Sequence, residues 1–115
     1  MIHRPSVPYK ERRIISAAIK KVKQDGRFDK SDSQLCRVIC VACNPEWQTL
    51  EELERRVQIS FRTRDSQTAI SARLREVSPI RHGVMKQSTK VKNETTGRFT
   101  WFYRVIPPVC GEGGQ

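Results

Sequence analysis

The sequence predicts an α+β domain that is mainly α-helical and ends in a β-hairpin. Two observations predict this fold class. Through the first 77 residues, apolar side chains recur at steps of three and four, which is the period of helices with one buried face. After Gly83 the period changes to two, which is typical of β-strands. The 115 residues leave room for one compact domain.

Residues 1–31 are expected to form a basic arm followed by a helix. Two prolines precede Tyr9 and predict an extended arm, and residues 10–24 carry an apolar stripe from Ile14 to Val22 at helical spacing. Gly26 follows, and glycine suits the left-handed conformation that ends many helices. The stripe could dock on the main domain or form the contact of a homodimer, and the sequence leaves both open.

Two capped helices are predicted next. Ser31 or Asp32 can cap a helix that runs through Ala42, where an Asn-Pro pair follows. Thr49 can cap a shorter helix, with Glu52 three residues later as its partner in a capping box. Side-chain oxygens at these positions bond the free amide groups of the first helical turn, so both starts are locally encoded.

A connection over residues 58–64 is predicted to join the third helix to a fourth. Asp65 or Ser66 can cap this fourth helix, which is expected to run to about Val77. Pro79 then stops it, because the residue before a proline is disfavoured in the helical conformation.

Residues 83–91 and 98–106 are predicted to pair as two strands, which complete a main domain of residues 32–106. Alternation in the second strand assigns one of its faces to the core. The side chains predicted on that face are Phe99, Trp101 and Tyr103. Residues 107–115 are rich in proline and glycine and are predicted to form a flexible tail.

Positive charge dominates the chain and is unevenly distributed. The formal net charge is +10. Residues 1–31 carry nine Lys and Arg against three Asp and Glu, and residues 58–115 carry ten against four. Residues 32–57 are net negative, with three against five. Two basic segments separated by an acidic one predict a surface that attracts a polyanion, and a solvated basic surface without such a role is the alternative.

The predicted helix over residues 65–77 has a polar outward face. Steps of about 100° per residue place Ile70, Leu74 and Val77 on its core side. Another arc carries donors and acceptors that can bond base edges and phosphates in a major groove. Its members are Gln67, Thr68, Ser71 and Arg75. An ordinary amphipathic surface helix would show polar residues outward as well.

The run from Asp65 to Val77 is followed by Gly83-Val84 and then by Gly-Arg-Phe-Thr-Trp-Phe-Tyr-Arg at residues 97–104. This ordered combination resembles the winged helix-turn-helix domains of bacterial and bacteriophage proteins, over about residues 49–106. In that pattern a recognition helix leads through a glycine-containing turn to a β-hairpin wing. The resemblance implies that residues 65–77 enter the major groove of double-stranded DNA, where the base-reading residues are Gln67, Thr68 and Ser71.

The resemblance also implies that basic residues on and around the hairpin contact the phosphate backbone. The predicted phosphate contacts are Arg62, Arg64, Arg75, Lys86, Lys90, Lys92 and Arg98. Residues 58–64 depart from the family pattern, since they form a longer and more basic connection than its tight turn.

From this resemblance we expect a DNA-binding protein, either a small phage- or prophage-type transcription regulator or a replication accessory factor. A module or inhibitor that binds a host protein is an alternative, and so is a binder of structured RNA. An enzyme is not expected, because the two histidines and twelve acids form no clustered acid–base or nucleophilic pair. The chain also lacks a glycine-rich loop that could cradle a phosphate.

Three cysteines, Cys36, Cys40 and Cys43, lie at helical spacing in an apolar stretch and are predicted to pack in the core. A zinc site would need a fourth ligand, and the candidates are His3, His82 and Cys110, none at a recognisable spacing. No metal and no other cofactor are therefore expected.

Apolar runs in this chain are short. None approaches the eighteen residues of a membrane span, and no apolar segment follows the N-terminal arm as in a signal peptide. We therefore expect no contact with membranes, a cytoplasmic location and reduced thiols.

Overall fold

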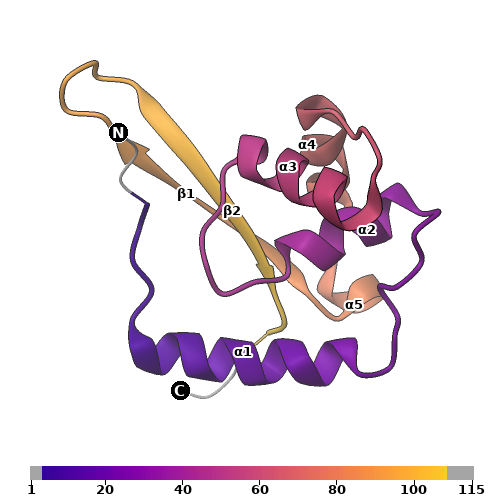
Figure 1. Ribbon diagram of the computed structural model, residues 1–115. Helices are drawn as coiled ribbons and strands as arrows, with labels where there is room; N and C mark the ends of the chain where they lie inside the picture. Colours follow the sequence, from indigo (N-terminus) through magenta and orange to yellow (C-terminus); the bar gives the residue numbers. More distant parts are fainter. Residues whose placement is uncertain (1–3, 109–115) are drawn as a thin grey trace.

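The computed structural model describes residues 4–108, and within them the fold is α+β, with five helices and one antiparallel hairpin. The elements are α1 (Tyr9–Lys23), α2 (Gln34–Ala42), α3 (Leu50–Phe61), α4 (Gln67–Glu76), α5 (Pro79–His82), β1 (Met85–Lys92) and β2 (Phe99–Ile106). Figure 1 shows α2, α3 and α4 gathered on one side, with the hairpin extending away from them and α1 running beneath both. This arrangement is compatible with a helix-turn-helix followed by a β wing.

Helix α1 forms where the apolar stripe predicts it and docks on the chain's own domain. Ile15 is 2% exposed and Ile19 8% exposed, and both belong to the central hydrophobic cluster. Ile14 keeps 40% of its surface exposed. The most buried residues of the stripe therefore pack within the chain. Ile14 stays available for a contact with a second copy.

The N-cap of helix α2 lies two residues later than the first of its predicted caps. Ser33, rather than Ser31 or Asp32, is the N-cap, and its hydroxyl accepts a hydrogen bond from the Cys36 amide at 3.2 Å. The predicted end at Ala42 is confirmed. Val38 and Ala42 are fully buried, so the helix forms the centre of the core.

Helix α3 starts as predicted but runs further. The Thr49 hydroxyl accepts from the Glu52 amide at 3.2 Å, and the Glu52 carboxylate accepts from the Thr49 amide at 2.9 Å, so the capping box is present. The helix continues to Phe61, and the predicted connection over residues 58–64 is therefore wrong. No glycine or proline interrupts residues 58–61, and Phe61 packs against the core. Arg62 then ends the helix in the left-handed conformation, at φ 59°.

Helix α4 begins at Gln67 after Ser66, whose hydroxyl accepts from the Ala69 amide at 3.1 Å. Ile70 is fully buried and Leu74 is 1% exposed, as the helical spacing predicts. Helix α5 is not among the predicted helices, because Pro79 predicts only the end of the preceding helix. Proline is tolerated in the first turn of a helix, and Pro79 opens this short one.

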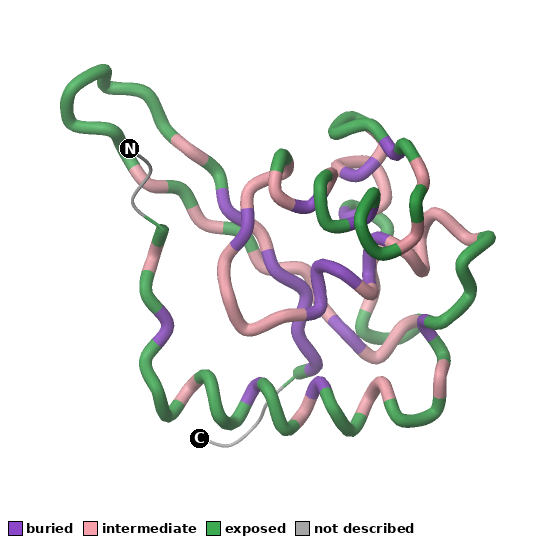
Figure 2. Tube along the Cα trace, viewed as in Figure 1, coloured by how far each residue is buried: buried purple, intermediate pink, exposed green. Residues whose placement is uncertain are grey.

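The two strands pair in the register Lys86↔Val105, Lys90↔Trp101 and Lys92↔Phe99. The predicted inward face of β2 is wrong for two of its three aromatic residues. Phe99 is 50% and Trp101 47% exposed, whereas Phe102 on the opposite face is fully buried. Figure 2 shows the distal hairpin exposed and the C-terminal end of β2 buried.

A third strand position lies between α2 and α3, where the sequence predicts none. Gln48 pairs with Tyr103 across the free edge of β2, with backbone hydrogen bonds of 2.9 and 2.7 Å in the two directions. Cys43 also forms an isolated bridge, with Val105. Isolated paired residues have no periodicity to detect, which explains why they escaped the prediction. The Gln48 bridge joins the start of α3 to the middle of β2.

Candidate nucleic-acid interface

Helix α4 presents its predicted polar arc on the surface. Gln67, Thr68 and Arg75 are exposed, and Ser71 is partly exposed. These four side chains line one open depression of about 340 Å³, and its fifth lining residue is Leu50 of α3. The structure thus brings together all three predicted base-reading residues and one predicted phosphate contact. Leu50 is an addition that the spacing along α4 alone could not reveal.

Hydrogen bonds already organise this depression. The Gln67 side-chain amide donates to the Glu54 carboxylate at 2.9 Å, and the Arg75 guanidinium donates to the Ser71 hydroxyl at 3.5 Å. Glu54 therefore brings one negative charge to the rim beside Gln67. A polyanion at this surface has to approach from the side of Thr68 and Arg75, or displace the Gln67–Glu54 contact.

The segment before α4 is held by a buried ion pair. The Asp65 carboxylate accepts from the Arg37 guanidinium at 3.0 and 2.9 Å, from Gln34 at 2.9 Å and from Thr63 at 2.8 Å. These hydrogen bonds, with Arg37 foremost, hold the pKa of Asp65 well below its usual value even though burial opposes the charge. Asp65 therefore presents no free negative charge at the start of α4.

Arg62 and Arg64 flank this anchored segment, and both are exposed. Arg62 closes α3 and Arg64 lies three residues before α4, so both cations sit at the turn between the two helices. Two of the predicted phosphate contacts thus share a rigid turn, since Thr63 between them donates to Asp65.

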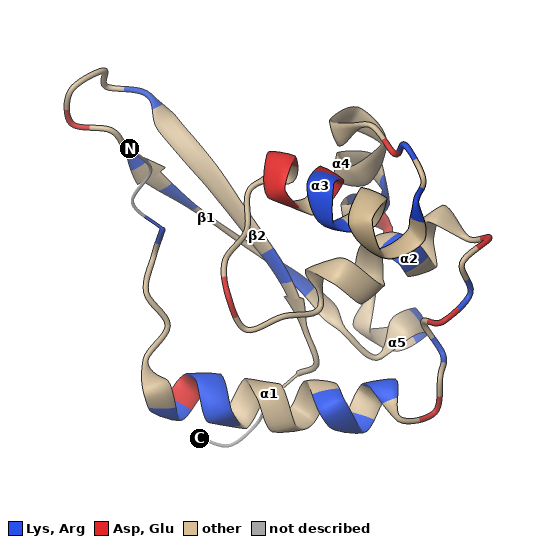
Figure 3. Cartoon of the chain, in the orientation of Figure 1, with Lys and Arg blue, Asp and Glu red and all other residues tan. Residues whose placement is uncertain are grey.

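The remaining predicted phosphate contacts lie on the hairpin. Lys90, Lys92 and Arg98 are exposed, and Lys86 is partly buried beside the Tyr103 ring, 5.9 Å from its centroid. Figure 3 shows these positive charges spread along the strands and not gathered beside α4. The structure therefore divides the predicted cations into a helical group and a hairpin group.

A row of aromatic rings accompanies the hairpin lysines. Because residues paired across antiparallel strands point to the same side, one face of the hairpin carries lysines from β1 and aromatic residues from β2. The members of this aromatic face are Lys86, Lys90, Lys92, Phe99, Trp101 and Tyr103. The Lys90 ammonium lies 4.4 Å from the Phe99 ring centroid and 5.5 Å from that of Trp101.

The opposite face of the hairpin, which we call the covered face, is covered by the N-terminal segment and by the loop between α2 and α3. Arg104 is 4% exposed and donates to Gln87, to the Pro45 carbonyl and to Glu11 of α1, at 2.8, 2.7 and 2.8 Å. Its guanidinium lies 4.3 Å from the Trp47 ring centroid. Arg104 is therefore a structural cation, and Trp47 packs on it.

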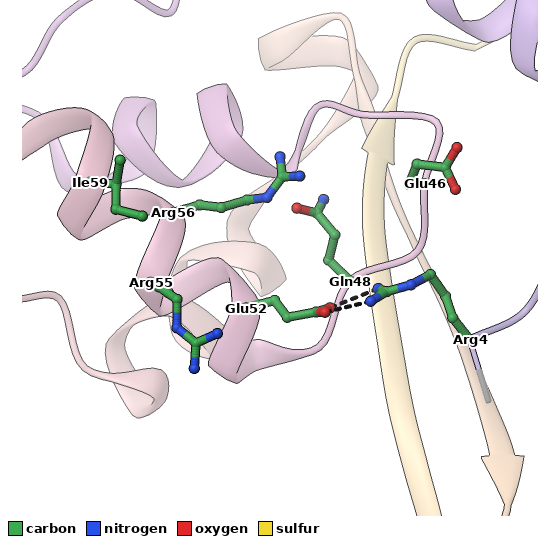
Figure 4. Close-up of a pocket in the computed structure, with 7 residues that line it drawn as sticks. All are labelled: Arg4, Glu46, Gln48, Glu52, Arg55, Arg56 and Ile59. Atoms are coloured by element: carbon green, nitrogen blue, oxygen red, sulfur yellow. Dashed lines mark hydrogen bonds and ion pairs between the residues drawn. The ribbon is translucent and has the colours of Figure 1, made fainter. Parts of the chain in front are cut away.

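A second depression, of about 360 Å³, opens beside the Gln48 bridge (Figure 4). Gln48 is 2% exposed, and both polar atoms of its amide lack a hydrogen-bond partner among residues 4–108. Arg4 and Glu52 form an ion pair across one side, and Arg4 lowers the pKa of Glu52 to about 2. The other charged residues that line the depression are Glu46, Arg55 and Arg56. Glu46 is ion-paired with Arg12, and Arg55 is ion-paired with Glu51.

The cysteines match their predicted place in the interior only in part. Cys43 is buried, and burial raises the pKa of its thiol to about 11, so the thiol stays protonated. Cys36 and Cys40 are partly exposed. Among residues 4–108, no group of three potential ligands lies close enough to hold a metal ion. His3 and Cys110, two of the candidate fourth ligands, lie outside the described residues, as do residues 109–115 of the predicted tail.

Within the described part of the chain, no helix is both long enough and apolar enough to cross a membrane. Comparison with known protein families, with curated proteins and with solved structures gives no match.

Proposed function

We propose that this chain is a winged-helix protein that binds double-stranded DNA. Helix α4 would lie in the major groove, and the hairpin would follow the sugar-phosphate backbone. The element order supports this proposal. Helix α2, the Gln48 bridge, α3 and α4 follow one another as helix, strand, helix and helix, and the paired strands come after the short α5. The Gln48 bridge strengthens the resemblance to winged helices beyond what the sequence alone offered.

The observation that carries the proposal is the shared depression on α4. Gln67, Thr68 and Ser71 offer both donors and acceptors, as base edges in a major groove require. Arg62 and Arg64 lie at the turn leading into the helix, where phosphates flank a groove-bound helix.

The tight turn between α3 and α4 also supports a helix-turn-helix. Five residues, 62–66, separate the two helices, and the buried Arg37–Asp65 pair holds them. The side chains of Arg37 and Asp65 are only 11% and 6% exposed, so the pair is largely shielded from solvent. A rigid turn keeps α4 at one angle to α3, which a groove-bound helix needs.

The biological setting proposed from the family resemblance is a small phage- or prophage-type regulator or a replication accessory factor. One recognition helix contacts only a few base pairs, and two copies would extend the site. Ile14 of the predicted stripe is 40% exposed and is available for such a homodimer.

The first test measures binding to random duplex DNA in a salt titration. Affinity should fall steeply as salt rises, because binding releases counterions from the phosphates. Lys92→Ala should weaken binding to all sequences alike and lower the salt slope by about one. Absence of binding even at low salt would contradict the proposal.

The second test uses duplexes selected from a random pool by the wild-type protein. Gln67→Ala should reduce discrimination between selected and random duplexes by about 1–3 kcal/mol, the value of one good base contact. Gln24→Ala is the matched control, because Gln24 is an exposed glutamine at the far end of α1. Equal discrimination by the Gln67 variant and the control would remove α4 as the reading helix.

A protein partner is the second candidate, and two exposed isoleucines favour it. Ile80 of α5 is 96% exposed and Ile59 of α3 is 72% exposed. A contact with a protein partner would remove this apolar surface from water, which is favourable. Ile80→Ser with unchanged DNA affinity but lost binding to a host protein would favour this candidate.

A further inference from the structure

We propose that the aromatic face of the hairpin binds an unpaired nucleic-acid strand, whose bases stack on Phe99 and Trp101. This site goes beyond the proposed duplex contact of α4 and does not depend on it. The ligand is single-stranded nucleic acid, and stacking alone does not distinguish DNA from RNA.

Exposure of the two rings is the first argument. Phe99 and Trp101 leave 50% and 47% of their surfaces open, next to each other on one face. Neither belongs to the hydrophobic core, whereas Val105, further along the same face, is fully buried in it. The rings thus lie outside the core, and about half of the surface of each stays open to solvent.

Spacing is the second argument. Residues two apart on one face of a strand are separated by about 6.6–6.8 Å, since each residue rises about 3.3–3.4 Å. That distance is about twice the 3.4 Å between stacked bases in a strand. A nucleic-acid strand that is stretched along β2 could therefore place one base on each ring, whereas a stacked duplex buries its base faces and could not.

Charge is the third argument. Lys90 and Lys92 run along β1 beside the rings, at positions paired with Trp101 and Phe99. Glu94 is the single acid in residues 85–106, against five basic residues. Proteins that bind single-stranded nucleic acid without sequence preference combine aromatic rings, on which the bases stack, with cations that contact the phosphates. The aromatic face carries both, on neighbouring β-strands.

The test uses fluorescein-labelled oligo(dT) and oligo(U) of about twelve nucleotides, within the known range of such sites. Trp101→Ala should lower affinity for the oligonucleotide about tenfold, which corresponds to 1.4 kcal/mol. A loss with both polymers, or with only one, supports the site and identifies the strand it accepts. Unchanged affinity of the Trp101 variant for both would overturn it, as would failure of the wild-type protein to bind either at low salt.

Direct contact with the ring is measured in a second variant. Trp47→Phe leaves Trp101 as the single tryptophan, so its fluorescence should be quenched when oligo(dT) is added. No quenching at saturating oligonucleotide would overturn the proposal without depending on the fold of an alanine variant. Gln67→Ala is the matched control: it should leave oligo(dT) affinity unchanged, so a failure of the α4 proposal and a failure of this one give different results.

Discussion

The aromatic rings in the distal half of β2 differ in exposure between the two faces of the strand. On the covered face, Phe102 is fully buried and Arg104 is 4% exposed. On the aromatic face, their neighbours Phe99 and Trp101 are about half exposed. The difference arises from what lies above each face. The N-terminal arm places Arg4 over Phe102, with its guanidinium carbon 6.0 Å from the ring centroid, and Arg104 bonds α1 and stacks on Trp47.

The alternation of side chains along a strand therefore assigns residues to two faces without indicating which residues are buried. An aromatic residue stabilises the fold only where another element removes it from water. On the covered face, burial is the role of the ring. On the aromatic face, the same type of ring stays available for a ligand, and substitutions on the two faces should therefore differ in what they damage.

The largest expected difference is between Phe102→Ala and Trp101→Ala. Removing the buried Phe102 ring should cost about 3–5 kcal/mol of unfolding free energy, because it leaves a cavity. Removing the half-exposed Trp101 ring should cost about 0.2–1 kcal/mol, the value of a cross-strand pair. Urea unfolding of both variants measures the difference. Equal costs would mean that the two faces are not distinct.

Charged residues should show the same contrast between buried and exposed positions. Asp65→Asn breaks the buried pair with Arg37 and should cost about 3 kcal/mol at neutral pH. Since the folded protein lowers the pKa of Asp65, its stabilisation is complete above the unfolded value near 3.9 and is lost as the pH falls below it.

The gap in stability between wild type and Asp65→Asn should therefore narrow between pH 7 and pH 3. Glu52 also has a lowered pKa, but it is present in both proteins and cancels in the comparison. Urea unfolding at the two pH values measures the gap. A gap of constant size would show that the Asp65 charge does not contribute to stability.

The smallest effect compares two cations on the hairpin. Arg104→Met keeps most of the side-chain volume on the covered face but removes three hydrogen bonds, and should cost about 2 kcal/mol. Lys90→Met on the aromatic face should change stability by less than about 0.5 kcal/mol. Thermal unfolding of the pair measures both changes. A larger cost for the Lys90 variant would contradict the assignment of the two faces.

Local signals predicted the helices well. The capping box at Thr49 and the apolar spacing of Ile70 and Leu74 depend on residues within one or two turns, and both formed as expected. The errors at helix ends also have local causes. Residues 58–61 continued as helix because nothing stopped them, and Pro79 could begin a helix as well as end one.

The candidate interface was predictable where it lies on one helix. Helical steps placed Gln67, Thr68, Ser71 and Arg75 together, and the depression on α4 contains all four. Contacts from other elements were not predictable in this way. Glu54 of α3 accepts a hydrogen bond from Gln67, thirteen residues further along the chain. No sequence pattern in either segment predicts that hydrogen bond.

The sequence was sufficient to predict the order of the four longer helices and the two strands, the starts of α3 and α4, and the two-residue period of the hairpin, because caps and periodicity act between near neighbours. Which rings of the hairpin are buried depends on the tertiary structure. Arg104 is 93 residues from Glu11 and 59 from Pro45, and it bonds both. Burial is a property of pairs of distant segments, and so the exposed rings of Phe99 and Trp101 became visible only when the chain was folded.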